Sequence, residues 1–338
     1  MIRTVIVDDS KIARDIIREF LIKDTAFSVV AEAENGDEAI RKVRELSPDL
    51  VTMDLVMRYS LEAIEYIHNT HGTPIVVISG KTNPKNMYET AMRGALDFFN
   101  KEDFSIEADE EKREHILKTL KRIARDKICQ SSDTAAVGLA GKKVKNRTIK
   151  AIVVAGSTGG PRALQVLFSA IPKDFNCPIF VVQHNSTGFD KSFVEWLGKY
   201  SAIGAKMGEN GERYEAGRIY IAPNGSHMMI DRKYIILTDS PPVHHQKPAA
   251  DILFKSAAES YGEALLGIVL TGMGSDGTSG VLAIKEANGV TIAQDQDSSL
   301  IYGMPKSAVE SGAIDLVLPL AEISKRIVEL CLRGAARQ

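Results

Sequence analysis

A serine, a histidine and an aspartate in the second half of the chain each follow a run of apolar, mostly β-branched residues. In chain order, the apolar runs and the polar residues after them are 151–155 and Ser157, 178–182 and His184, and 266–270 and Asp276. Reacting groups in open α/β sheets gather beyond the carboxyl ends of the strands, so these three side chains can meet although they are distant in sequence. A serine hydroxyl, an imidazole that takes its proton and a carboxylate that orients the imidazole are the machinery of a serine hydrolase. We therefore predict a catalytic triad of Ser157, His184 and Asp276.

The glycine-rich turn around Ser157 has a second interpretation, because such turns also bind phosphate groups. Residues 156–161 read Gly-Ser-Thr-Gly-Gly-Pro, which contains neither Gly-x-Gly-x-x-Gly nor Gly-Lys-Ser/Thr. The next apolar run ends in Gln183-His184, where a dinucleotide-binding fold has an acidic residue for the ribose. These details favour a nucleophile and leave an anion-binding turn as the alternative.

A tetrahedral intermediate also needs hydrogen-bond donors for its negatively charged oxygen. The backbone N–H groups near Thr158 and Gly159, at a predicted helix start, and near Met273, in a glycine-rich loop, are the candidates for this oxyanion hole. The other histidines of this half are weaker candidates for a catalytic base; they are His227, His244 and His245. No histidine and carboxylate spacing resembles a zinc-binding helix, so we expect no metal or other cofactor in this half.

A second group of reactive residues occupies the first half of the chain. Asp8 and Asp9 end the first predicted strand and Asp54 ends the third, so three carboxylates gather at one sheet edge. Carboxylates so near to one another need a cation to offset their charge, and Mg²⁺ prefers oxygen ligands. Ser79 after the fourth strand and Lys101 after the fifth add a hydroxyl and a positive charge, so Asp54 is predicted to accept a phosphoryl group. The alternative is that Asp9, or the serine after it, caps the following helix.

The elements that position both groups follow from the spacing of apolar residues. Predicted strands of the first half are 4–7, 29–33, 50–53, 74–78 and 97–99, and helices between them indicate a doubly wound sheet. The second half adds a β-hairpin within 218–239, helices at 249–261, 277–287 and 320–332, and a strand at 290–293. The predicted domains are 1–126 and 149–338, with a flexible linker, 127–148, that contains Lys142, Lys143, Lys145 and Arg147.

Composition limits the partners and the location. The chain has 338 residues, of which 44% are hydrophobic and 25% charged, and a formal net charge of −2. These values fit soluble globular domains and give no general attraction to nucleic acid or anionic lipid. The three cysteines are widely spaced, which argues against disulfides and fits the cytoplasm. Apolar runs are shorter than the roughly 20 residues that span a bilayer, so we expect no membrane insertion.

The first half resembles a response-regulator receiver domain. The matching residues are Val7, Asp8, Asp9 and Ser10, Met53 and Asp54, Ile78 and Ser79, Phe98, and Lys101. The resemblance implies a flavodoxin-like, five-stranded parallel sheet, phosphorylation of Asp54 with Mg²⁺, and a switch formed by Ser79, Phe98 and Lys101. The chain departs from the family pattern because Met-Pro does not follow Asp54 and Glu102 stands where a proline usually follows the lysine.

The whole chain resembles the chemotaxis protein-glutamate methylesterase family, in which a receiver precedes a serine esterase. The motifs are 156–161, 182–184, 221–223, 247–251, 271–277 and 303–306. The resemblance assigns catalysis to Ser157, His184 and Asp276 in a doubly wound, mainly parallel α/β domain with a β-hairpin insertion. It implies hydrolysis of γ-glutamyl methyl esters on methyl-accepting chemoreceptors, deamidation of receptor glutamines, and a chemotaxis histidine kinase as phosphodonor. Asn185-Ser186 replaces the usual Met-Pro, and Lys247 replaces an arginine whose bidentate contact lysine cannot reproduce.

Two other functions stay open at this point. One is a phosphorylation-controlled binding module with a vestigial esterase site, and the other is a general hydrolase of small esters. For the favoured esterase we predict that the unmodified receiver covers the cleft and that phosphorylation of Asp54 shifts the population toward an open form.

Overall fold

The computed structural model describes residues 1–80, 89–105, 110–129, 148–185 and 190–332. Contacts divide the chain into two compact units, Met1–Ala135 and Ala136–Gln338. The four basic residues of the predicted linker lie outside the described residues. The predicted domain limits of 126 and 149 stay a prediction.

The first unit is built on a five-stranded parallel sheet with the strand order β2-β1-β3-β4-β5. Its strands are β1 (Ile2–Val7), β2 (Phe27–Ala33), β3 (Leu50–Met53), β4 (Ile75–Ser79) and β5 (Ala95–Asn100). Every residue of β3 and β4 is buried, as expected for central strands covered by helices on both faces. All five predicted strands are confirmed, and with them the flavodoxin-like order.

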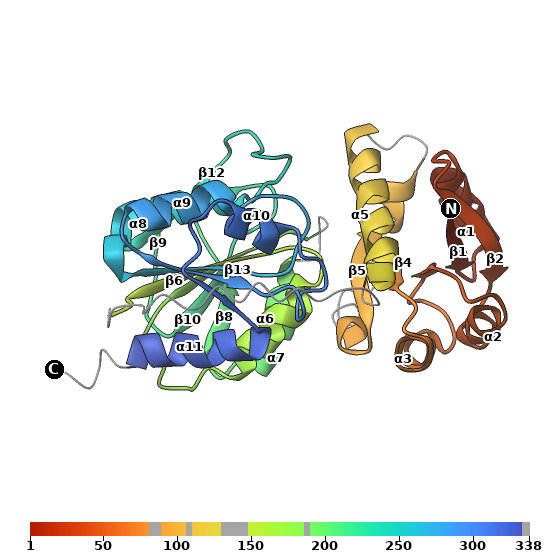
Figure 1. Ribbon diagram of the computed structural model, residues 1–338, viewed down its shortest axis with the longest axis horizontal. Helices are drawn as coiled ribbons and strands as arrows, with labels where there is room; N and C mark the ends of the chain where they lie inside the picture. Colours follow the sequence, from red (N-terminus) through yellow and green to blue (C-terminus); the bar gives the residue numbers. More distant parts are fainter. Residues whose placement is uncertain (81–88, 106–109, 130–147, 186–189, 333–338) are drawn as a thin grey trace. The chain divides into compact units, whose positions relative to one another are not determined.

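The helices of the first unit cover both faces of its sheet. They are α1 (Lys11–Ile22), α2 (Gly36–Leu46), α3 (Ser60–His71), the 3₁₀ helix η1 (Lys101–Phe104) and α5 (Glu110–Cys129). Helices α1 and α5 lie on one face, and α2 and α3 lie on the other (Figure 1). The Ser10 hydroxyl caps α1 by accepting a hydrogen bond from the N–H of Ala13 at 3.3 Å, so the capping alternative holds for this serine. Helix α5 extends three residues into the predicted linker.

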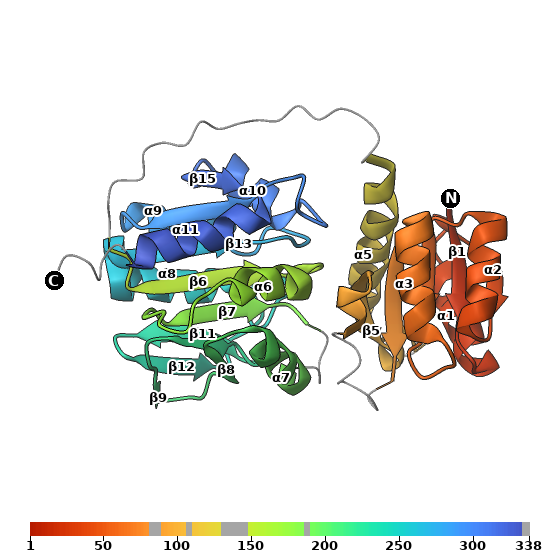
Figure 2. The same cartoon turned by 90° about the horizontal axis from the view of Figure 1, so that it is seen from below.

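The second unit contains a seven-stranded parallel sheet with the order β15-β14-β13-β6-β7-β10-β8. In that order, the strands are Leu316–Leu318, Val290–Gln294, Leu265–Val269, Ala151–Gly156, Ile179–Gln183, Arg218–Ile221 and Gly204–Met207. The three central strands, β13, β6 and β7, lie side by side and are buried throughout (Figure 2). Their carboxyl ends therefore open on the same edge.

Helices cover this sheet on both faces as well. They are α6 (Gly160–Ser169), α7 (Asp190–Tyr200), α8 (Ala250–Tyr261), the 3₁₀ helix η2 (Gly262–Ala264), α9 (Thr278–Glu286), α10 (Met304–Glu310) and α11 (Leu320–Leu332). Helices α8, α9 and α10 cover one face, and α6, α7 and α11 cover the other (Figure 1). The doubly wound prediction for this half is confirmed. None of the described helices combines the length and apolar character that crossing a membrane requires.

The predicted hairpin is present, but it is shorter than the predicted stretch. Strands β11 (His227–Asp231) and β12 (Tyr234–Thr238) pair antiparallel, and β9 (Glu212–Arg213) joins β12 in a separate three-stranded sheet. The beginning of the stretch, Arg218–Ile221, instead forms β10, which pairs parallel with β7 and β8 in the main sheet.

Candidate active site and phosphoacceptor site

Ser157 and His184 leave the sheet from adjacent strand ends. Gly156, the last residue of β6, is in register with Gln183, the last residue of β7. One residue further, the N–H of His184 donates to the carbonyl oxygen of Gly156 at 3.0 Å. The serine and the histidine therefore follow adjacent strands at the same carboxyl edge, and their joint action in a triad stays a prediction.

His184 and Asp276 are in direct contact. His184 Nε2 lies 2.9 Å from Asp276 Oδ2, and both side chains are buried. Because Nε2 faces a carboxylate it carries the proton, which leaves Nδ1 as the basic nitrogen. Nδ1 is buried and has no hydrogen-bond partner in the described part of the chain, and the Ser157 hydroxyl is not bonded to the ring there.

The carboxylate of Asp276 also caps helix α8. Its Oδ2 accepts a hydrogen bond from the N–H of Ala250 at 2.7 Å, and Oδ1 accepts from those of Asp251 at 3.0 Å and Gly277 at 2.9 Å. Burial opposes ionisation of Asp276, but the bond from His184 and these backbone donors outweigh it and lower its pKa. The carboxylate is therefore fixed and charged, as an orienting residue must be.

Sequence reasoning missed this capping, although a signal for it exists. The N-cap residue of α8 is Ala249, whose side chain cannot accept a hydrogen bond, so the first N–H groups of the helix need an acceptor from elsewhere. Asp251 repeats the arrangement one helix further on, because its buried carboxylate accepts from the N–H of Gly280 in α9 at 2.7 Å. Burial raises the pKa of Asp251.

The predicted oxyanion residues lie in two loops that pack together at Ser157. The N–H of Ser157 donates to the carbonyl of Thr271 at 3.1 Å, and a side chain at Gly272 would meet the Cβ of Ser157 at 2.7 Å. Gly159 has a φ of 77°, which glycine adopts without strain, and it begins α6 beside the buried Thr158. Oxyanion binding by the N–H groups of Thr158, Gly159 and Met273 stays a prediction.

His227 and Lys247 have structural contacts. The N–H of Ala249 donates to His227 Nδ1 at 3.1 Å, and Nε2 lies 3.1 Å from the carbonyl oxygen of Pro241, so both ring nitrogens of this buried histidine are engaged. Lys247 forms an ion pair with Asp239. Neither residue contacts the His184–Asp276 pair in the described contacts.

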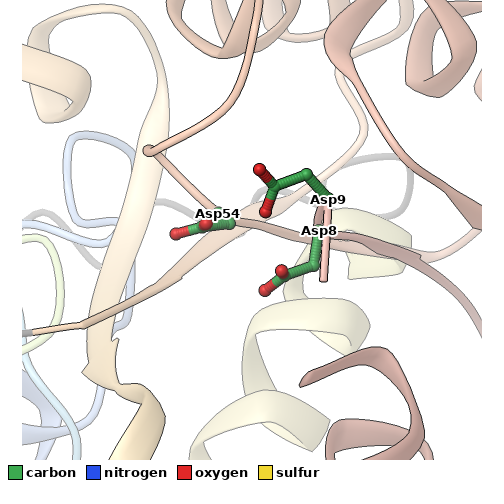
Figure 3. A group of neighbouring side chains, drawn as sticks. All are labelled: Asp8, Asp9 and Asp54. Carbon is green, nitrogen blue, oxygen red and sulfur yellow. The ribbon is translucent and has the colours of Figure 1, made fainter. Parts of the chain in front are cut away.

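The three carboxylates of the first unit come together at the ends of β1 and β3 (Figure 3). One oxygen of each of Asp8, Asp9 and Asp54 lies within 4.8 Å of the others. Lys101 Nζ stands 2.7 Å from Asp8 Oδ2 and 2.9 Å from Asp54 Oδ2. Burial raises the pKa of Asp8, and the two carboxylates raise that of Lys101 although burial opposes its charge. Three neighbouring carboxylates, two of them paired with the same ammonium, fit a divalent cation with oxygen ligands, such as Mg²⁺.

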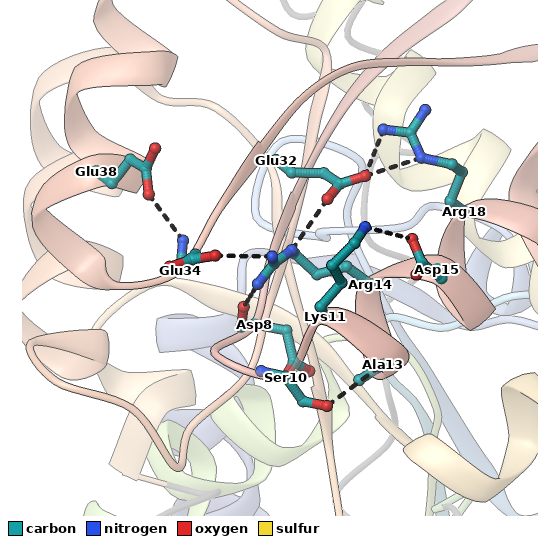
Figure 4. A network of polar contacts seen from close by, with 10 residues as sticks. All are labelled: Asp8, Ser10, Lys11, Ala13, Arg14, Asp15, Arg18, Glu32, Glu34 and Glu38. Carbon is teal, nitrogen blue, oxygen red and sulfur yellow. Dashed lines mark hydrogen bonds and ion pairs between the residues drawn. The ribbon is translucent and has the colours of Figure 1, made fainter.

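A buried arginine holds the loop that carries two of these carboxylates. The guanidinium of Arg14 donates to the backbone carbonyl of Asp8 at 2.7 Å, to Glu32 at 3.0 Å and to Glu34 at 2.9 Å (Figure 4). Burial opposes its charge, but the two glutamates raise its pKa, so the guanidinium stays ionised. Sequence reasoning did not identify this brace.

The other predicted residues of the phosphoryl switch occupy β4, which pairs with β3, and β5, the edge strand beyond β4. Ser79 is the last residue of β4 and Phe98 lies within β5, and both are buried. Their roles as switch residues, together with that of Lys101, stay predictions.

The fold and these sites are those of a receiver-like domain followed by an α/β hydrolase domain, and comparisons with known proteins agree. Residues 4–108 match the response regulator receiver domain family, and residues 152–327 match the CheB methylesterase family. A protein-glutamate methylesterase/protein-glutamine glutaminase of Clostridium acetobutylicum is 36% identical over 350 residues, with 99% of both chains covered. One of Pyrococcus horikoshii is 34% identical, covering 97% of this chain and 93% of its own. The Thermotoga maritima CheB methylesterase catalytic domain matches 54% of this chain and 99% of its own at 38% identity, with a TM-score of 0.53. The chain belongs to the protein-glutamate methylesterase/protein-glutamine glutaminase family.

Proposed function

We propose that the chain hydrolyses γ-glutamyl methyl esters of chemoreceptors with Ser157 as nucleophile, and that it deamidates receptor glutamines at the same site. The observation that carries the proposal is the buried pair of His184 and Asp276 beside the strand that presents Ser157, with no partner for Nδ1 of the imidazole among the described residues. The names of its full-length relatives support the substrate class.

The geometry supports a two-step acyl transfer. Ser157 Oγ attacks the ester carbonyl while His184 Nδ1 takes the hydroxyl proton, and Asp276 stabilises the imidazolium that results. The imidazolium then protonates the departing methoxide, so methanol leaves and an acyl-enzyme forms. Water, deprotonated by the same imidazole, hydrolyses the acyl-enzyme to the receptor carboxylate and free serine. With glutamine as substrate the leaving group is ammonia.

Regulation is proposed to begin at Asp54, which receives a phosphoryl group from a chemotaxis histidine kinase in the cytoplasm. Asp8, Asp9 and Asp54 would hold Mg²⁺, which offsets negative charge at the acceptor when it is bound. Lys101 keeps a positive charge against Asp54 and stabilises the charge that the phosphoryl group adds. Phosphorylation would shift the population of the chain toward a form with an open active site.

The decisive experiment measures methanol release from a methylated receptor. Ser157→Ala should reduce the rate by at least about 10⁴-fold, because the nucleophile is lost. The matched control is Ser169→Ala, which removes an exposed hydroxyl at the end of α6 and should behave as the parent chain. Equal rates for Ser157→Ala and the parent would favour the binding module. Robust turnover of soluble ester probes, without activity on receptor, would favour the general hydrolase.

The regulatory step has its own test. Adding a small phosphodonor with Mg²⁺ should raise the esterase rate of the parent chain and leave that of Asp54→Asn unchanged. Deleting residues 1–148 should raise the basal rate. An unchanged rate in both experiments would contradict the gating proposal and leave the hydrolase proposal intact.

A further inference from the structure

We propose that Gln183 is a positioning residue that sets the distance between the nucleophile and its base. Its side-chain amide binds the backbone of both catalytic residues: Nε2 donates to the carbonyl oxygen of Ser157 at 2.9 Å and to that of His184 at 3.0 Å. The inference rests on the proposed function, because it assigns a task only if Ser157 and His184 react together.

The two bonds tie the strand ends together where the sheet pairing stops. Strands β6 and β7 pair as far as Gly156 and Gln183, and one further backbone bond joins His184 to Gly156. After Gly156 the chain turns and enters helix α6 at Gly160. One NH₂ group whose two protons point at fixed angles holds the two carbonyl groups, and so the two backbones, at a defined separation.

The other end of the amide shows that this arrangement is not explained by stability alone. Gln183 Oε1 is buried and has no hydrogen-bond partner in the described part of the chain, which costs free energy. The opposite amide orientation would place this oxygen against the two carbonyl oxygens, so the bonds to Ser157 and His184 fix the orientation. This loss of free energy is explained if the NH₂ group of Gln183 is needed to hold the backbones of Ser157 and His184 in place.

Two glycines of the Ser157 turn provide the space for this amide. A Cβ on Gly160 would lie 2.0 Å from Gln183 Oε1, and a Cβ on Gly156 would lie 3.0 Å from it. The glycine-rich motif around Ser157 is therefore required by the glutamine under the turn, as well as by any approach of substrate. A methyl group at Gly160 must displace the amide, which is the flexible end of a long side chain.

Gln294, at the end of β14, provides a contrast within the same sheet edge. Its Oε1 accepts from the N–H of Thr271 at 2.8 Å and its Nε2 donates to the carbonyl of Ser298 at 2.6 Å, so both ends are satisfied. Gln294 is an ordinary structural brace of a loop. Gln183 differs because both of its bonds go to the backbone of the proposed triad and its oxygen has no partner among the described residues.

The test compares three variants of the full-length chain on methylated receptor. Gln183→Met keeps the approximate volume and removes both bonds, and Gly160→Ala pushes the amide away while leaving the glutamine present. We expect kcat to fall about 100-fold for Gln183→Met and about 10-fold for Gly160→Ala, with KM changed by less than about twofold, because reacting groups are misplaced and substrate contacts are kept. Gly198→Ala in α7 is the control, since nothing lies within 4 Å of the added methyl group and parent kinetics are expected.

A third variant separates positioning from packing. In Gln183→Glu the carboxylate cannot donate at neutral pH, whereas its protonated form regains one donor, so the ratio of its kcat to that of the parent should rise as the pH falls. If Gln183→Met does not fold, Gly160→Ala and this pH profile decide the question.

The outcomes separate this inference from the proposed function. Parent-like kcat in Gln183→Met and Gly160→Ala, or a loss that only follows the unfolded fraction, overturns the positioning role while Ser157→Ala is still inactive. Activity that survives Ser157→Ala overturns the proposed function itself. A selective loss of kcat in the two variants, with unchanged thermal unfolding of Gly160→Ala, supports the inference.

Discussion

Asp54 and Asp276 are both buried carboxylates at the carboxyl ends of parallel sheets, but their surroundings are opposite. Asp54 accepts one backbone bond, from the N–H of Leu55 at 2.8 Å, and one from Lys101, and two further carboxylates stand beside it. Asp276 accepts three backbone bonds and one from His184. A carboxylate has about four acceptor positions, so the described residues fill all four at Asp276 and only two at Asp54. The free acceptor positions suit a group that reacts, and the saturated carboxylate suits one that only orients its neighbour.

The largest expected effect comes from changing Asp276, the carboxylate with four hydrogen bonds. Asp276→Asn places an NH₂ group among N–H donors and no longer stabilises the His184 imidazolium, so kcat should fall by about 10⁴-fold. Unpaired donors at the start of α8 should also lower the free energy of unfolding by about 2 kcal/mol. Receptor demethylation and thermal unfolding measure the two effects. Asp231→Asn, at an exposed position ending β11, is the control, and kcat above about one tenth of the parent value in Asp276→Asn would contradict the assigned role.

The second largest effect is expected from changing Asp54, and it should not alter the catalytic step of ester hydrolysis. Asp54→Asn should abolish phosphoryl transfer from a small phosphodonor, and removal of divalent cations with a chelator should slow transfer to the parent chain by about 100-fold. Basal ester hydrolysis should be unchanged in both cases. Phosphate incorporation on a gel that retards phosphoproteins provides the measurement, with the exposed Asp37→Asn as control. Full incorporation into Asp54→Asn would place the acceptor elsewhere.

The same contrast explains what the sequence could predict. Asp8, Asp54, Ser157 and His184 directly follow strands, or nearly so, and β-branched runs are local signals, so the sheet edges and their reactive residues could be placed. The partners of Asp276 could not, because Ala250 and Asp251 precede it by about 25 residues and act through backbone N–H groups that every residue has. The task of Gln183 depends likewise on the packing of its amide against Gly160, which no spacing rule encodes.

The smallest expected effect is on the free energy of unfolding. Its dependence on pH should have opposite signs for Asp8 in the first unit and Asp276 in the second. Burial raises the pKa of Asp8, so the first unit binds a proton more readily when folded, and this contribution to stability is fully present below pH 3.8 and lost as the pH rises through the raised value. The pKa of Asp276 is lowered, so its contribution is present above 3.8 and lost as the pH falls through the lowered value.

Asp8→Asn should therefore stabilise the first unit at neutral pH, in contrast to Asp276→Asn in the second. The variant removes a buried charge and its repulsion with Asp54, while Lys101 keeps Asp54 as its partner, so the unfolding free energy should rise by about 1 kcal/mol. Calorimetry of the full chain from pH 4 to pH 8 should show that this gain shrinks toward the acidic end, where Asp8 of the parent becomes protonated. A gain that is constant over this range, or a loss at neutral pH, would mean that the ion pair with Lys101 outweighs the burial of Asp8.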